Sequence, residues 1–112
     1  MSESPHAPLG VFEEQVVVAV LRTRDEAYGM QVRREIERVT DRDVAIGAVY
    51  ATLDRLEAKG LLLSTRVRAD GPSRRLFAVT PVGARALADT RAMRERLWQG
   101  VDVRGLLVLA GT

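Results

Sequence analysis

The sequence predicts a mainly α-helical protein with a small β-hairpin and a long C-terminal helix. Four stretches, residues 9–22, 28–39, 45–59 and 81–99, repeat apolar residues at helical spacing. Residues 63–68 and 76–79 alternate with period two on either side of a segment rich in turn formers. Thr80–Pro81, a threonine N-cap before a proline at the first helical position, then predicts the start of the last helix.

Length and composition predict one small domain and exclude several functions. The chain has 112 residues, 17 basic and 15 acidic, and no cysteine, so disulfides, thiolate metal sites and cysteine nucleophiles are excluded. The lone histidine, His6, has no partner residues for a metal site or for nucleophilic catalysis, and no glycine-rich phosphate loop follows a strand. We therefore expect no enzyme, cofactor or metal.

The apolar segments also bear on location. Residues 1–10 contain no hydrophobic core of a signal peptide, and the longest apolar run, residues 16–21, is too short to cross a bilayer. We therefore expect a soluble, cytoplasmic protein that has no membrane partner.

The first helical stretch admits two interpretations. After a mobile arm at residues 1–8, Phe12, Val16 and Val20 form a helical stripe, but the run VVVAVL also has the β-branched composition of a strand. Glu13 and Glu14 would interrupt the alternation of a strand and suit the first turn of a helix. A helix is therefore favoured.

The next two helices form a helix-turn-helix pattern. Tyr28–Val39 carries its apolar residues on one face, and the polar turn Thr40–Val44 joins it to the helix that begins near Ala45. The charged face of the second helix is most simply a solvated surface.

The third helix has two different faces, and Gly60 ends it as a left-handed C-cap. Its apolar face carries Val49, Leu53 and Leu56. The opposite face is predicted to carry small, hydroxyl and cationic side chains: Ala48, Ala51, Thr52, Arg55 and Lys59. Because small side chains let a helix approach base edges in the major groove, this helix is predicted to recognise DNA.

The hairpin concentrates positive charge. Arg66, Arg68, Arg74 and Arg75 against Asp70 give the ribbon a local charge of +3, whereas the whole chain carries +2. Phosphate contacts depend on such local charge. Two other interpretations stay open: charge that protects an edge hairpin from aggregation, and arginines that pair with Glu57 and Asp70.

The C-terminal helix, which we expect to end near Gln99, carries an apolar stripe that it cannot bury alone. The stripe comprises Val82, Ala86, Thr90, Met93 and Leu97. It predicts packing against a second chain, against the first helix of the same chain, or both. The sequence leaves open whether the tail, residues 101–112, extends that contact. The predicted organisation is a mobile arm at 1–8, a winged helix-turn-helix DNA-binding domain at 9–80, and a dimerisation helix with a tail at 81–112.

Three segments resemble the PadR family of bacterial transcriptional regulators, in order and spacing. They are AYGMQVRREIE, GAVYATLDRLEAKGLL and GPSRRLFAVTPVGARAL, which span most of residues 9–90. The chain departs from the family pattern at Ala45–Ile46, where a Ser-Pro-like cap is frequent, at Ala51, where proline is common, and at Phe77, where tyrosine is common.

The resemblance implies a sequence-specific, dimeric transcription factor, usually a repressor, that releases double-stranded DNA when a small molecule binds or conditions change. The residues it implies at the DNA are Tyr28, Gly47, Ala48, Tyr50, Thr52, Arg55, Lys59, Arg66, Arg68, Arg74 and Arg75. Trp98 is the candidate for an effector site, although an ordinary packed tryptophan also fits. The expected dimer interface is Phe12, Val16, Met93, Leu97 and Trp98. The alternative is a winged-helix protein-interaction module that does not bind DNA.

Overall fold

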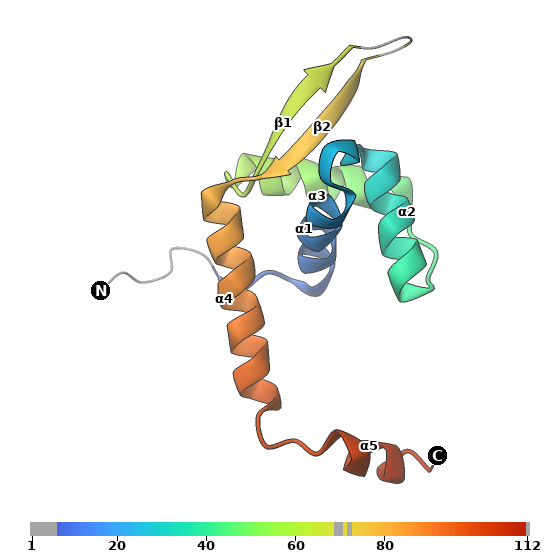
Figure 1. Ribbon diagram of the computed structural model, residues 1–112, viewed down its shortest axis with the longest axis vertical. Helices are drawn as coiled ribbons and strands as arrows, with labels where there is room; N and C mark the ends of the chain where they lie inside the picture. The colour runs from blue at the N-terminus through green and yellow to red at the C-terminus, as the bar shows by residue number, and fades with distance from the viewer. Residues whose placement is uncertain (1–6, 69–70, 72, 112) are drawn as a thin grey trace, which may run out of the picture.

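The computed structural model describes residues 7–68, 71 and 73–111. Its elements follow the order α1 (Val11–Thr23), the 3₁₀ turn η1 (Arg24–Glu26), α2 (Gly29–Thr40), α3 (Ile46–Ala58), β1 (Leu62–Val67), β2 (Arg74–Val79), α4 (Pro81–Trp98) and α5 (Val103–Leu109) (Figure 1). The predictions for residues 1–6 of the arm, including His6, and for residues 69, 70 and 72 of the hairpin turn lie outside the described residues.

The hydrophobic core lies between α1, α2 and α3 and is closed by the base of the hairpin. Helices α1 and α2 pack side by side, α3 packs against both, and β2 contacts α1. The largest side chains that this core buries are Val16, Val17, Val32, Val49, Leu53, Leu56, Leu61, Leu62 and Phe77. The valines, Leu53 and Leu56 come from the apolar faces of the helices, and Leu61, Leu62 and Phe77 come from the base of the hairpin, so the predicted mainly α-helical class with a hairpin is confirmed.

Residues 11–23 form a helix despite the β-branched run. Glu13 accepts a hydrogen bond from the backbone N–H of Gly10 at 3.0 Å, which closes a capping interaction over the first turn. Val16, Val17 and Val20 then bury one face of the helix. Tertiary burial on a helical face outweighs the modest preference of valine for strands.

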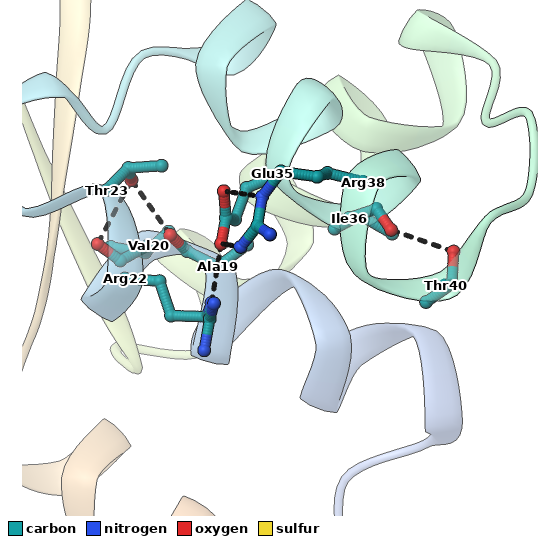
Figure 2. Close-up of polar contacts among 8 residues, drawn as sticks. All are labelled: Ala19, Val20, Arg22, Thr23, Glu35, Ile36, Arg38 and Thr40. Atoms are coloured by element: carbon teal, nitrogen blue, oxygen red, sulfur yellow. Dashed lines mark hydrogen bonds and ion pairs between the residues drawn. The ribbon is translucent and has the colours of Figure 1, made fainter.

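An ion cluster joins α1 to α2. Glu35 of α2 accepts hydrogen bonds from Arg22 of α1 at 2.6 Å and from Arg38 at 2.7 Å (Figure 2). These two guanidinium groups, Arg38 first, lower the pKa of Glu35 to about 2. The hydroxyls of Thr23 and Thr40 donate to carbonyl oxygens of the last turns of their helices (Figure 2).

Polar contacts fix the turn between α2 and α3. Asp41 ends α2 in the left-handed region, with φ at 56°, and its N–H donates to the carbonyl of Glu37. The carboxylate of Glu37 accepts the N–H of Val44 at 2.8 Å, and Arg33 donates to the carbonyl of Val44 at 2.8 Å. The entry to α3 is therefore held by α2, although no side chain caps α3.

Gly60 ends α3 as predicted. Its φ is +79°, its N–H donates to Glu57, and the N–H of Leu61 donates to Leu56. This Schellman motif satisfies the last carbonyls of the helix and turns the chain into β1.

The hairpin is antiparallel and anchored at its base. Leu62 lies opposite Val79 and Ser64 opposite Phe77. Leu62 and Phe77 are buried, and the N–H of Phe77 donates to the carbonyl of Ala27 at 3.0 Å. Leu63, on the other face of the ribbon, is exposed. The ribbon therefore rises from the helices as a wing (Figure 1).

Helix α4 starts at Pro81, because Thr80 accepts the N–H of Gly83 at 3.0 Å. A Cβ on Gly83 would lie 2.0 Å from the carbonyl oxygen of Leu61, so only glycine allows this close approach. Farther along, Thr90 accepts the N–H of Leu9 at 3.0 Å, and Arg94 pairs with Glu14 of α1. Ala86 and Thr90 of the predicted apolar stripe are thus buried within the same chain, whereas Val82 at its start is 47% exposed.

The end of the chain leaves apolar side chains in solvent. Leu97 is 73% exposed and Trp98 49% exposed, and Val108 and Leu109 of α5 are also exposed. Asp102 caps α5, which lies at the opposite end of the molecule from the wing (Figure 1). No helix in the described part of the chain is long and apolar enough to cross a membrane.

Candidate nucleic-acid interface

The outer face of α3 is exposed and almost free of bulk. Gly47, Ala48 and Ala51 lie at the surface, and nothing lies within 4 Å of a Cβ built on Gly47. The opposite face buries Val49, Leu53 and Leu56. The helix therefore presents a slim surface that can approach the floor of a major groove closely.

The expectation that Thr52 lies on this surface is wrong. Its side chain is buried at 3% exposure, and its hydroxyl oxygen lies 3.4 Å from a donor nitrogen of Arg55. Residue 52 follows Val49 by three positions and precedes Leu56 by four, so it belongs to the apolar stripe.

A cationic groove lies between the N-terminus of α2, the start of α3 and the wing. It has a volume of about 430 Å³. Its lining brings together predicted DNA-binding residues from separate elements, Tyr28, Tyr50, Arg66, Arg74 and Arg75, with Gly29, Met30, Gln31, Arg34 and Ser73. Because the groove borders α3 through Tyr50, cationic side chains and the small face of α3 share one side of the molecule.

Two aromatic contacts organise this groove. The guanidinium carbon of Arg74 lies 4.4 Å from the centroid of the Tyr28 ring, a cation–π distance. The ring of Tyr50 lies against Gly29, where a Cβ would be 2.4 Å from Tyr50 Cζ. Gly29 was missed as a site residue by the sequence analysis, although the Tyr-Gly pair at the start of α2 was the available signal.

The predicted phosphate contact of Arg75 requires a free guanidinium group, but this group is already paired within the chain. Its guanidinium lies 2.8 Å from Asp54 and 2.7 Å from Glu57, both on α3. Glu57 also accepts hydrogen bonds from the hydroxyl and the N–H of Ser64. The Ser64 hydroxyl, followed by Arg75, lowers the pKa of Glu57. Pairing with Glu57 was one of the alternatives the sequence left open, and here it attaches the wing to α3.

The last turns of α3 carry two more predicted cations. Arg55 and Lys59 both contact the same oxygen of Glu13 on α1, at 3.4 Å and 3.1 Å. The N–H of Gly10 is the main cause of the lowered pKa of Glu13, and both cations add to it. Arg55 and Lys59 nevertheless remain about half exposed. Arg68 is exposed just beyond the end of β1.

The residues predicted for the dimer interface divide into two groups. Val16 is 0% exposed in the core of its own chain, so its assignment to an interface is wrong. Phe12 packs partly against the same core. Met93 lines a hollow of about 310 Å³ between α4 and residues 7–8, whereas Leu97 and Trp98 are exposed. Of the residues predicted for this interface, Leu97 and Trp98 are the exposed ones and remain candidates for contact with a second chain.

A helix-turn-helix followed by a two-stranded wing, with the second helix of the motif exposed beside arginines, defines a winged helix-turn-helix protein of the kind that binds DNA. The family model described as the transcriptional regulator PadR-like family matches residues 17–89. The chain therefore belongs to the PadR-like family of transcriptional regulators, which are not enzymes, and the resemblance found in the sequence is confirmed.

Individual proteins with similar sequence or fold are also transcriptional regulators. The chain is similar to the transcriptional regulator Rv3488 of Mycobacterium tuberculosis, with 41% identity over 73 residues that cover 65% of this chain and 67% of the relative. A PadR family regulator from Eggerthella lenta shares the fold with a TM-score of 0.66 and 25% identity, over 88% of each chain. A PadR-like regulator from Bacillus cereus has a TM-score of 0.66 and 22% identity, over 92% of this chain and 95% of that one.

Proposed function

We propose that this regulator binds double-stranded DNA in the cytoplasm, with the outer face of α3 in the major groove and the wing along the backbone. One observation carries the proposal: the small face of α3 and the groove with Arg34, Arg66 and Arg74 adjoin on one side of the molecule. Gly47, Ala48 and Ala51 let the helix approach base edges, and the arginines neutralise phosphates.

Individual residues then have distinct roles. Arg66, Arg68 and Arg74 contact phosphate directly, and Tyr28 holds Arg74 by the cation–π contact. Tyr50, packed on Gly29, offers its hydroxyl to phosphate near the N-terminus of α2. Arg75 acts indirectly, because its ion pairs set the angle of the wing against α3.

A salt titration tests the proposal against the alternative of a protein-interaction module. Binding of wild-type protein to random duplex DNA is expected to weaken linearly in a plot of log affinity against log salt, by a slope of about −0.9 for each phosphate contacted. Replacing Arg66 and Arg74 by alanine should make this slope shallower by about 2 and weaken binding to all sequences alike.

The matched control removes the same charge from α4. Arg85 and Arg91 are largely exposed there, each paired with a carboxylate one helical turn away. If alanine at both positions reduces the slope as much as Arg66→Ala with Arg74→Ala, net charge rather than the groove determines binding. If wild-type protein shows no salt-dependent binding, the interaction-module alternative is favoured.

We also propose that the protein works as a homodimer. The exposed apolar residues Leu97, Trp98, Val108 and Leu109 lie on the last turn of α4 and on α5, away from the DNA-binding face (Figure 1). A two-fold contact here gives two α3 helices for the two half-sites of an operator. Sedimentation of only monomer at micromolar concentration would count against it.

We propose further that the dimer is a repressor that leaves its operator when a small molecule binds near Trp98. The indole is half exposed at the end of α4, and the hollow beside Met93 lies about one and a half turns earlier on the same helix. Because Trp98 is the single tryptophan of the chain, its fluorescence reports ligand binding directly. A ligand that changes this fluorescence should also release DNA. Release with unchanged fluorescence would place the effector site elsewhere.

A further inference from the structure

The carboxylate of Glu13, in the first turn of α1, contacts two cations at the end of α3. One oxygen of Glu13 is 3.1 Å from the ammonium nitrogen of Lys59 and 3.4 Å from Nε of Arg55. The other oxygen accepts the N–H of Gly10 at 3.0 Å. Glu13 thus binds two cations of the recognition helix in the way that a phosphate would.

The contacts around Glu13 fix its position. The carboxylate caps its own helix, and the flanking residues are attached to α4 through the bond from Leu9 to Thr90 and the ion pair of Glu14 with Arg94. Its side chain is only 14% exposed. The longer side chains of Arg55 and Lys59 are about half exposed, so they can turn outward while Glu13 cannot follow them.

This arrangement sets up a competition. A phosphate that binds Arg55 or Lys59 must replace a carboxylate already in contact with the same groups, and the displaced Glu13 remains nearby as a like charge. The net gain from such a phosphate contact is smaller than for an arginine without an internal partner, and it is the same for every DNA sequence.

We propose that Glu13 is an internal counter-ion that lowers the affinity of the recognition helix for DNA backbone, by the same factor for operator and for other DNA. The inference rests on the proposed DNA binding, and it adds a residue that lowers the affinity for DNA. Glu13 is a positioning residue, since it acts through Arg55 and Lys59.

The test is Glu13→Gln, because glutamine at this position can still accept the Gly10 N–H and keep the cap. Binding to random duplex DNA should tighten roughly threefold to tenfold at low salt, and the salt slope should steepen by about 1 to 2 units. Affinity for an operator selected from genomic fragments should rise by the same factor, so the ratio of specific to non-specific affinity should stay unchanged.

Two controls separate this mechanism from a general charge effect. Glu95→Gln makes the same change of charge on the exposed side of α4, where Glu95 pairs with Arg91, and should leave the slope unchanged. In a background of Arg55→Ala with Lys59→Ala, Glu13→Gln should give no gain, because the residues through which it acts are absent.

Several results would overturn the inference. They are unchanged or weaker binding of Glu13→Gln, an equal gain from Glu95→Gln, and a gain that persists without Arg55 and Lys59. The failure of the proposed function looks different, because wild-type protein itself would then show no salt-dependent binding to DNA.

Discussion

Gly83 and Gly47 differ in the space that is available for a side chain. Gly83→Ala should lower the free energy of unfolding by about 1–3 kcal/mol, because the new Cβ meets the backbone carbonyl of Leu61, which cannot rotate away. Gly47→Ala, with open space around it, should change stability by less than about 1 kcal/mol. Urea denaturation of both variants measures the difference. Equal effects would mean that α4 and Leu61 are not in close contact.

Glu35 makes stability depend on pH in a defined direction. Its pKa of about 2 in the folded protein lies below the ordinary 4.5, so the unfolded chain binds more protons between these values. The stabilising contribution of Glu35 is therefore complete above about pH 4.5 and is lost as the pH falls towards 2.

Glu35→Gln removes this contribution. Urea denaturation between pH 6 and pH 3 should show wild type more stable at pH 6 and the difference narrowing as the pH falls. A difference that stays constant over this range would show that the contacts of Glu35 with Arg22 and Arg38 do not depend on its charge.

Residue roles could be predicted from sequence only where they depend on neighbours along the chain. Spacing alone places Ala48 and Ala51 on the small face of α3, and the family resemblance adds Gly47; all three are exposed as expected. Thr52 was assigned to the outer face for its hydroxyl, although its spacing of three from Val49 and four from Leu56 places it on the buried face. The sequence left open the pairing of Arg75 with Glu57, 18 positions away, but no local pattern indicated that Arg55 contacts Glu13, 42 positions away.

Whole elements were predicted more securely than single contacts. Thr80–Pro81 is a local start signal, and α4 begins there. Gly60 is a local stop signal, and α3 ends there. In the first helix, the valine-rich composition favours a strand and the acidic residues favour a helix. Burial of the valines against α2 and α3 decides for the helix. Neither the short η1 turn nor α5 was predicted, because three to seven residues carry too little periodicity.

Arg74 and Arg75 are neighbours in the wing, but only Arg75 attaches the wing to α3. Arg75→Ala should lower the free energy of unfolding by roughly 1 kcal/mol, since it removes a partly exposed guanidinium from two carboxylates. Arg74→Ala, which removes an exposed side chain stacked on Tyr28, should change stability by less than about 0.5 kcal/mol.

DNA binding provides the second comparison within this element. Arg74→Ala should reduce the salt slope by about 0.9, the value for one phosphate. Arg75→Ala should weaken binding by loosening the wing and by leaving Asp54 and Glu57 as unpaired negative charge beside the backbone. Hydrogen exchange in β1 and β2 should rise only in Arg75→Ala. A rise of equal size in both variants would contradict the distinction.

The molecule as a whole separates two kinds of surface along its longest dimension of 53 Å. The wing lies at one end and the apolar α5 at the other, with the core between them (Figure 1). The arrangement allows two chains to join through their apolar ends while both α3 helices stay exposed.

Leu97→Glu with Leu109→Glu tests this arrangement at the scale of the dimer. Both side chains are strongly exposed in the single chain, so the charged variant should fold normally and sediment as a monomer where wild type is a dimer. Its affinity for an isolated half-site should be unchanged. Its affinity for two half-sites one DNA turn apart, roughly 34–36 Å, should fall strongly, because the two chains no longer bind as a unit. A variant that stays dimeric, or a monomer that loses half-site binding as well, would show that α4 and α5 do not supply the proposed two-fold contact.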